Sequence, residues 1–465
     1  MRPLLSQIYA TLPTGLQSVA CTADGYRRSL GSFTPYFHET LDTWEKRVND
    51  PGGVQRERQW ELLNQLIERA RKQVPYYRFL PPVIDTGEAA SSIEKTLAKI
   101  PPLEKAVYRA RPKDFVSRDV ASRRLQMRST SGTTGTALPV WHTSERIAEG
   151  YAAVWRQRRH FGVQIEDPVI NFTGQVIVPL TQQDPPFWRQ DYLSGMTLFS
   201  MYHLSQRNLP AYIDEIHSAP ASYVHGYPSV LHLVSRAMVE SNRCLAAGQL
   251  KGVFTHSESV LAFQRETIEK AFGAPIRDYY HSTEETVSMT ACDVGRLHVD
   301  MEYGIVEVEP VEETETYVRG PLIVTGLGAV ATPFIRYRIG DVGTRLKGTC
   351  ECGRPGDVFL DIDGRIEDYV STPDGRLVGR LDHIFKEQYE IEEAQIIQRN
   401  VDSISVRVVA GDRFGDKDRK NLEREVHARL GTRIHVNIEL VETIPREPNG
   451  KLRAVKSLIE EIREW

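Results

Sequence analysis

Hydrophobic residues recur at helical spacing in the first part of the chain. Between residues 38 and 80, apolar side chains stand three or four positions apart, as Leu41 and Trp44 do and then Leu63 and Leu66. This spacing places them on one face of a helix, and the Val74-Pro75 step is a typical helix end. We therefore expect amphipathic helices here that form a structural layer.

Further along, apolar runs of strand length alternate with helical stretches. The runs lie at residues 167–172, 221–226 and 252–256, and helical spacing covers residues 229–240 and 261–272. Strand followed by helix, repeated, is typical of α/β architecture with buried sheets.

The pattern changes after Gly304. Short alternating strands at 305–309 and 322–325, separated by Gly and Pro turns, indicate a β-rich subdomain. The last segment has a strand at 404–410, then a charged helix and a second strand, which suggests a small α+β domain.

These patterns predict an α/β fold in two domains. We expect a large N-terminal domain over residues 1–365, with several subdomains that include α/β sheets and the β-rich part, and a small α+β C-terminal domain over residues 366–465. A chain of 465 residues that is 40% hydrophobic can bury a core of this size.

Charge and composition exclude several classes of function. The formal net charge is −4 with 26% charged residues, so no global basic field favours nucleic acid or an anionic membrane. No stretch approaches the roughly 18 apolar residues that span a bilayer, and the N-terminus reads as part of the mature chain. We expect a soluble, cytoplasmic protein without nucleic-acid or membrane partners, and the five cysteines fit reduced thiols.

Residues 128–140, RSTSGTTGTALPV, are rich in Gly and small hydroxyls between two strand-like segments. Such a loop can turn backbone N–H groups and hydroxyls toward a phosphate, because Gly allows unusual backbone angles and close approach. A flexible linker is the alternative, but the stretch is short and its flanks are strand-like. It is not a Walker A loop, and Gly326–Ala331 is not a dinucleotide fingerprint because Thr332-Pro333 follows where a helix should run.

Other motifs accompany this loop in a fixed order. They are Tyr280-His-Ser-Thr-Glu284, Pro333-Phe-Ile-Arg-Tyr-Arg-Ile-Gly-Asp341, Gly364-Arg-Ile-Glu-Asp368 and Pro448-Asn-Gly-Lys-Leu-Arg453. Together they resemble motifs of the adenylate-forming superfamily, and within it of phenylacetate-CoA ligases and their CapK-like relatives. The resemblance covers nearly the whole chain.

The resemblance implies a role for each motif. The phosphate loop would consist of Thr130, Ser131, Gly132, Thr133, Thr134 and Gly135. Tyr280 would belong to the ATP site, Thr283 would contact phosphate and Glu284 would help to hold Mg²⁺, which prefers oxygen ligands. A polar turn is the alternative for this stretch, and His281 replaces the usual Gly beside the acyl pocket.

The resemblance also assigns the nucleotide, hinge and lysine positions. Asp341 would accept hydrogen bonds from the ribose hydroxyls, and Arg365 would meet the nucleotide. Glu367 stands at the hinge of a mobile small domain that alternates between two orientations. Lys451 would reach into the site and neutralise charge on the α-phosphate and carboxylate, although a Gly-Lys turn is also common on surfaces.

Weaker matches suggest an acyl pocket. Glu258 is placed near the adenine, while Phe172, Tyr227, His256 and His281 are candidates for the pocket wall. Phe172, Tyr227 and His256 could equally belong to the core, since ligand sites and cores both collect aromatic side chains.

Cys292, His298, Cys350 and Cys352 form C-x5-H and C-x-C pairs around the β-rich segment. Three cysteines and one histidine make a closed tetrahedral zinc set. Scattered buried thiols are the alternative. Because zinc-binding relatives of the phenylacetate-CoA ligase group are similar here, we favour a structural Zn²⁺ without a catalytic role.

The functional hypothesis is an ATP-dependent, AMP-forming ligase that activates a carboxylic acid, with an aromatic acid favoured. CoA and an amine both stay open as the acceptor, because residues 371–386 look more like CapK-like proteins than like phenylacetate-CoA ligases. An amide synthetase without a CoA step, and an adenylyltransferase that leaves AMP on its product, are the alternatives. A nucleotide sensor is disfavoured because Lys451, Glu284 and Asp341 are all present. The resemblance also suggests a homodimer.

Overall fold

The computed structural model describes residues 8–129, 138–363, 369–379, 381–385, 390–411, 413–445 and 453–459. Its N-terminal part is helical, in agreement with the apolar spacing of residues 38–80. The helices are α2 (Thr14–Ser32), α3 (Pro35–Arg47), α4 (Gly52–Gln73), α5 (Ala89–Ala98) and α6 (Lys105–Ala110). Thr34 caps α3, because its side-chain oxygen accepts a hydrogen bond from the amide of Phe37. On α4 the buried face includes Leu63, Leu66 and Ile67.

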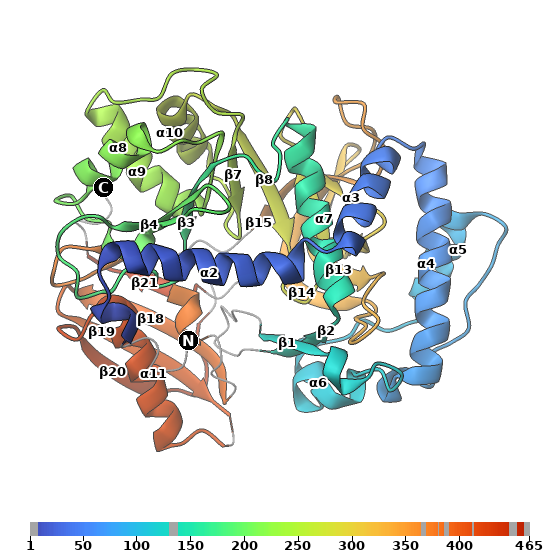
Figure 1. Cartoon of the computed structure of the whole chain (residues 1–465). Helices are drawn as coiled ribbons and strands as arrows, with labels where there is room; N and C mark the ends of the chain where they lie inside the picture. The colour runs from blue at the N-terminus through green and yellow to red at the C-terminus, as the bar shows by residue number, and fades with distance from the viewer. Residues whose placement is uncertain are drawn as a thin grey trace.

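A mixed sheet of 13 strands forms the middle of the large domain (Figure 1). Its order is β11 (Gly304–Val308), β13 (Tyr317–Gly326), β14 (Tyr337–Leu346), β15 (Val358–Asp363), β10 (Leu297–Val299), β9 (Ser288–Ala291), β8 (Ile276–His281), β7 (Val253–His256), β6 (Tyr223–Gly226), β3 (Val169–Thr173), β5 (Met196–Ser200) and β4 (Trp188–Asp191), with β12 (Glu312–Glu313) paired to β13. Strands β5, β3, β6, β7 and β8 are parallel. From β8 to β11 the pairing is antiparallel, so the β-rich segment continues the α/β sheet.

Helices bury both faces of the parallel strands. On one face, α8 (Leu209–Ser218), α9 (Pro228–Glu240) and α10 (Ala262–Phe272) pack on Ile170 and Val224 in a large apolar cluster. On the other, α7 (Ser144–His160) places Ala152 and Trp155 against Val169 and Tyr223. Two-sided cover explains why these strands read as continuous apolar runs rather than as alternating ones.

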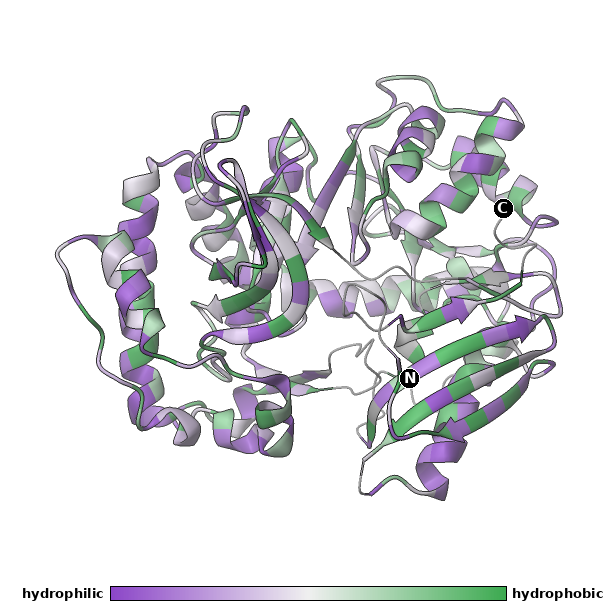
Figure 2. Ribbon diagram, turned by 180° about the vertical axis from the view of Figure 1, so that it is seen from behind, coloured by the Kyte–Doolittle hydropathy of each residue, from purple (hydrophilic) through white to green (hydrophobic). Residues whose placement is uncertain are grey.

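The small domain is a four-stranded sheet with one long helix. Its strand order is β20 (His435–Leu440), β19 (Ser403–Ala410), β18 (Ile391–Asn400) and β21 (Val455–Ser457), and α11 (Asp416–Leu430) packs on it. Hydrophobic and hydrophilic residues alternate along these strands in Figure 2, as expected for a sheet with one buried face. A short hairpin of β16 (Val370–Ser371) and β17 (Leu377–Val378) and the 3-10 turn η5 (Leu381–Phe385) complete the described part.

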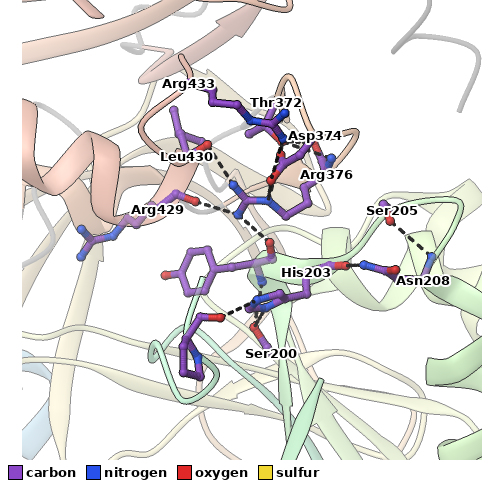
Figure 3. Close-up of polar contacts among 12 residues, drawn as sticks. Ser200, His203, Ser205, Asn208, Thr372, Asp374, Arg376, Arg429, Leu430 and Arg433 are labelled. Atoms are coloured by element: carbon purple, nitrogen blue, oxygen red, sulfur yellow. Dashed lines mark hydrogen bonds and ion pairs between the residues drawn. The ribbon is translucent and has the colours of Figure 1, made fainter. Parts of the chain in front are cut away.

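Arg376 joins the small domain to the large one (Figure 3). It is buried, its Nε donates to both carboxylate oxygens of Asp374 at 3.1 and 3.0 Å, and one Nη donates to the carbonyl of Tyr202 at 2.8 Å. The same guanidinium donates to the carbonyls of Arg429 and Leu430 at the end of α11, at 3.1 and 2.9 Å. Tyr202 lies in the 3-10 turn η4 (Met201–His203) that follows β5, so one side chain ties three segments together.

The fold class predicted from the sequence is confirmed: an α/β body with a β-rich part is joined to a small α+β domain. Among the described residues, no helix combines the length and the apolar character needed to cross a membrane.

Candidate active site at the edge of the parallel strands

The parallel strands end side by side, and the residues after them meet at one edge of the sheet. Strands β6, β7 and β8 end at Gly226, His256 and His281. Ligands in open α/β sheets bind at the carboxyl ends of such strands. The antiparallel hairpin of β1 (Gln126–Ser129) and β2 (Pro139–His142) borders the same place, since Arg128 of β1 lies 3.3 Å from Glu285.

Two predicted nucleotide residues are in direct contact. The hydroxyl of Tyr280, at the end of β8, donates to Oδ2 of Asp341 at 2.6 Å. Asp341 follows Gly340, whose φ of +94° suits glycine, and its side chain is half-buried on β14. The hydrogen bond fixes one carboxylate oxygen, so Oδ1 can turn toward a ligand.

The turn after β8 carries Thr283 and Glu284. The backbone amides of Thr286 and Val287 donate to Oγ of Ser282 at 3.0 and 3.3 Å, and this closes the turn. Thr283 is exposed at its tip, whereas Glu284 is buried and accepts a hydrogen bond from the Tyr337 hydroxyl at 3.4 Å. Glu284 is therefore a positioned carboxylate at the strand edge, of the kind that suits Mg²⁺.

Glu258 holds the beginning of α9. Its two carboxylate oxygens accept from the amide and the hydroxyl of Ser229, both at 2.9 Å. An acidic group at a helix N-terminus is stabilised by the helix dipole. The geometry gives Glu258 a structural task in addition to its predicted place near the adenine.

Glu285, which the sequence analysis did not single out, is a buried carboxylate of the same edge with three side-chain partners in the described part of the chain. It is 3% exposed and accepts from His281 Nε2 at 3.0 Å, from Arg128 at 3.3 Å and from the Tyr303 hydroxyl in a short contact. Burial acts to raise the pKa of Glu285, but the charge and hydrogen bond of His281, together with the effects of His142 and the Tyr303 hydroxyl, outweigh it and the pKa falls to about 2. His281 is thereby held by Glu285 beside the site. In the sequence, only the position of Glu285 next to Glu284 could have indicated that it belongs to the candidate site.

The four pocket candidates have different surroundings. His281 lines a cavity of about 430 Å³ between α7 and the sheet. His256 stacks on His225, which lines the same cavity, with ring centroids 4.6 Å apart. The ring centroid of Tyr227 lies 4.7 Å from that of His256. Phe172 instead stacks on Phe199 in the core on the opposite face, because successive side chains of a strand point to opposite sides.

The four candidate metal ligands come together. Their ligand atoms all lie within 4.8 Å of one another. Cys292 directly follows β9, His298 is on β10, and Cys350 and Cys352 lie between β14 and β15. The Sγ atoms of Cys292 and Cys350 are 3.9 Å apart, and Cys352 Sγ is 3.4 Å from His298 Nε2. The cysteines are free thiols, and this set of three sulfurs and one nitrogen fits a closed zinc site.

The remaining predicted residues lie outside the described part of the chain. They are Thr130, Ser131, Gly132, Thr133, Thr134, Gly135, Arg365, Glu367 and Lys451.

Comparisons with known proteins agree with this architecture. Residues 370–458 match the CapK C-terminal domain. The chain is 25% identical over 459 residues to Protein CapK of Staphylococcus aureus, and the match covers 97% of this chain and 98% of that protein.

Solved structures of 2-hydroxyisobutyryl-CoA ligase have the same fold. The thioesterification-state structure with 2-HIB-AMP and CoA superposes with a TM-score of 0.56 at 19% identity and covers 90% of this chain and 93% of that one. The open-conformation structure gives a TM-score of 0.52 at 18% identity, with 88% and 93% covered. The resemblance predicted from the motifs is thereby confirmed: residues 370–458 match the CapK C-terminal domain, the chain is similar to Protein CapK over nearly its whole length, and its fold is that of the 2-hydroxyisobutyryl-CoA ligase structures.

Proposed function

We propose that the protein is an ATP-dependent, AMP-forming ligase that activates a carboxylic acid as its acyl-adenylate. The observation that carries this proposal is the Tyr280–Asp341 hydrogen bond of 2.6 Å at the same strand edge as the buried carboxylate of Glu284. A cavity of about 430 Å³ reaches this edge at His281 and Glu285 and is large enough for a small organic acid.

In the proposed reaction, a carboxylate oxygen of the acid attacks the α-phosphorus of ATP. A new P–O bond forms, the bond to pyrophosphate breaks, and the acyl-adenylate remains. Residues 130–135 and Thr283 would bind phosphate, Asp341 the ribose, Arg365 the nucleotide and Glu284 the Mg²⁺. Lys451 would offset negative charge as it develops, which is the main way in which phosphoryl-group chemistry is accelerated.

A second step would transfer the acyl group to a nucleophile. The small domain would turn about Glu367, and either the thiol of CoA or an amine would attack the acyl carbon and release AMP. CoA is supported by the neighbouring ligase fold, whose solved structures contain 2-HIB-AMP and CoA. An amide synthetase would use an amine instead, and an adenylyltransferase would leave AMP on its product.

ATP–pyrophosphate exchange across a panel of aryl, heteroaryl and aliphatic acids tests the first step. We expect one class of acid to stimulate exchange and Lys451→Ala to abolish it. Lys420→Ala, a change of an exposed lysine on α11, should leave exchange unchanged. ATP binding without exchange for any acid would contradict the ligase proposal and favour the adenylyltransferase or a nucleotide sensor.

Adding CoA or amines to the stimulating acid then identifies the acceptor. Formation of a thioester with free AMP supports the CoA ligase, and formation of an amide supports the amide synthetase. Stable incorporation of AMP into the product identifies the adenylyltransferase.

The zinc site and the homodimer belong to the same proposal. The Cys292, His298, Cys350 and Cys352 set would hold one Zn²⁺ as a structural tie. Light scattering on the purified protein tests the dimer, because a mass of twice 52.8 kDa is expected.

A further inference from the structure

The cavity beneath α7 is elongated along the helix. Ile147, Gly150, Tyr151, Val154 and Arg158 all line it, and their spacing of three or four residues puts them on one face of α7. The eight steps along the helix from Gly150 to Arg158 correspond to about 12 Å along its axis. The cavity therefore has two distinct ends.

One end is the strand edge described above. There the lining side chains are Arg128, His281 and Glu285. The other end lies at the beginnings of β3 and β6, where Val169, Tyr223 and Asp167 line the wall with Arg158. An acid whose carboxylate is activated at the first end would direct the rest of its skeleton toward the second.

Arg158 at the far end is a buried cation that has no polar partner among the residues described by the structure. It is 9% exposed, its Nε has no hydrogen-bond partner, and its guanidinium makes no hydrogen bond or ion pair with a residue in the described part of the chain. Three aromatic rings surround it, with the guanidinium carbon 4.8 Å from the centroid of Trp155, 5.5 Å from Tyr223 and 5.8 Å from Phe254. Cation–π contacts with ring faces stabilise its charge but give Nε–H no acceptor, and the Nη groups remain available to a ligand in the cavity.

The neighbouring arginines of α7 are all paired, so Arg158 differs from them. Arg156 pairs with Asp300, and Arg159 with Asp42 and Glu45. Asp167, the carboxylate at the same end of the cavity, is already held by Lys251 Nζ at 2.6 Å and by the amide of Gln164 at 2.7 Å.

A buried charge normally has a partner, because burial removes its hydration and only a partner compensates for that loss. We propose that the acid activated by this protein carries a second anionic group, in the simplest case a second carboxylate, which binds to Arg158. The two acidic groups would be less than about 12 Å apart, because an arginine side chain leans back toward the helix N-terminus. An aromatic or short-chain dicarboxylic acid fits this description. The inference rests on the ligase proposal and specifies its substrate class.

Matched pairs of substrates test the proposal. Each dicarboxylic acid is compared with its monomethyl ester, which keeps the shape and the reacting carboxylate but removes the far charge. In ATP–pyrophosphate exchange we expect kcat/KM to be about 10- to 100-fold higher for the diacid. Arg158→Gln should remove this preference mainly through KM, whereas Arg158→Lys, which keeps the positive charge, should retain part of it.

Arg159→Gln is the matched control, since it removes a paired arginine one position along the same helix. It should leave the preference for diacids intact. Thermal unfolding of each variant shows whether it is folded, and the Lys variant keeps the test decisive if the Gln variant is not. Equal activity with diacids and half-esters, or an unchanged preference in folded Arg158→Gln, would overturn the proposal while the ligase proposal stands.

Calorimetry separates the failure of this inference from failure of the ligase proposal. If no acid supports exchange, the binding of the diacid and of its half-ester is measured in the absence of ATP. Binding of the diacid alone, lost in Arg158→Gln, still supports an anion site at Arg158. No difference in binding between the two compounds refutes it.

Discussion

The hydrogen bond from Tyr280 to Asp341 positions a carboxylate through a residue 61 positions away in sequence. We predict that Tyr280→Phe raises the KM for ATP about tenfold with little change in kcat, because Asp341 loses the donor that orients it toward ribose. The measurement is pyrophosphate exchange at varied ATP. Tyr317→Phe is the control, since Tyr317 donates to Glu312 at the same 2.6 Å on the surface and should leave the KM unchanged. An unchanged KM in Tyr280→Phe would show that Asp341 does not depend on this contact.

Some residues of the candidate site could be predicted from the sequence and others could not. Tyr280, Glu284 and Asp341 stand in recognisable motifs, and the structure places them at one edge of the sheet. Glu285 and Arg158 stand in no motif. What distinguishes them is burial, together with the three side-chain contacts of Glu285 and the aromatic surroundings of Arg158, which only the folded chain supplies. Phe172 lies in the core rather than along the cavity because the direction of a side chain depends on strand register, which two-sided burial conceals.

At the scale of elements, α7 approaches the site closely because position 150 is glycine. A Cβ on Gly150 would lie 2.6 Å from Glu285 Oε2 and 3.2 Å from both His281 Cε1 and the Tyr303 hydroxyl. We predict that Gly150→Ala destabilises the protein by about 1 to 3 kcal/mol and lowers activity, although alanine favours helices. Gly53→Ala on α4 meets no atom within 4 Å and should instead stabilise by up to about 1 kcal/mol. Chemical denaturation of both variants checks the opposite signs.

The cysteine cluster links two elements of the β-rich part. It joins the residue after β9 and strand β10 to the segment before β15. His298 of β10 pairs in register with Val358, the first residue of β15. We predict one Zn²⁺ per chain by elemental analysis, and a midpoint of thermal unfolding several degrees lower, by about 3 °C or more, in Cys350→Ser or after chelation. Cys244→Ser, outside the cluster, should keep both the metal and the stability. A purified protein without zinc but with wild-type stability would contradict this role.

Element prediction succeeded where burial produced a regular pattern and failed where it did not. The strand predicted at residues 404–410 is found as β19 (Ser403–Ala410), whose buried and half-buried residues alternate. Helix α2 was not predicted, because Leu16 and Val19 are more than half exposed and Gln17 and Ser18 are buried. At these positions the polar residues are buried and the apolar residues are exposed, the reverse of an ordinary amphipathic helix. The spacing of apolar residues therefore gives little indication of a helix here.

At the scale of the whole molecule, Arg376 secures the contact between the two domains. We predict that Arg376→Met destabilises the protein by about 3 to 5 kcal/mol, because Asp374 and three backbone carbonyls lose a buried donor. Limited proteolysis should then release the small domain faster. Arg413→Met removes an exposed arginine of the same domain, paired with Glu390, and should change neither quantity measurably. Equal proteolysis rates in both variants would contradict the role of Arg376.

The same contact should make the molecule sensitive to acid. The pKa of His203 is lowered from 6.5 to about 4, mainly by burial and next by the positive charge of Arg376. The Pro179 carbonyl and Asp374 act in the opposite direction but do not outweigh these effects. The unfolded chain therefore binds a proton below pH 6.5 that the folded chain does not take up until about pH 4. The contribution of His203 to the free energy of unfolding should be fully present above pH 6.5. It should be lost, by up to about 3 kcal/mol, as the pH decreases to 4.

The ring of His203 hydrogen-bonds Ser200 Oγ at 2.8 Å and the Pro179 carbonyl at 3.2 Å. The substitution His203→Gln isolates this contribution, because the side-chain amide of glutamine also offers a donor and an acceptor but does not titrate. Urea unfolding between pH 7 and pH 4 should show a shallower loss of stability in this variant than in the wild type. It should also be shallower in Arg376→Met, where the positive charge beside the ring is gone and the pKa of His203 returns toward 6.5. Parallel pH profiles in all three proteins would mean that acid acts on the molecule elsewhere than at the contact between its domains.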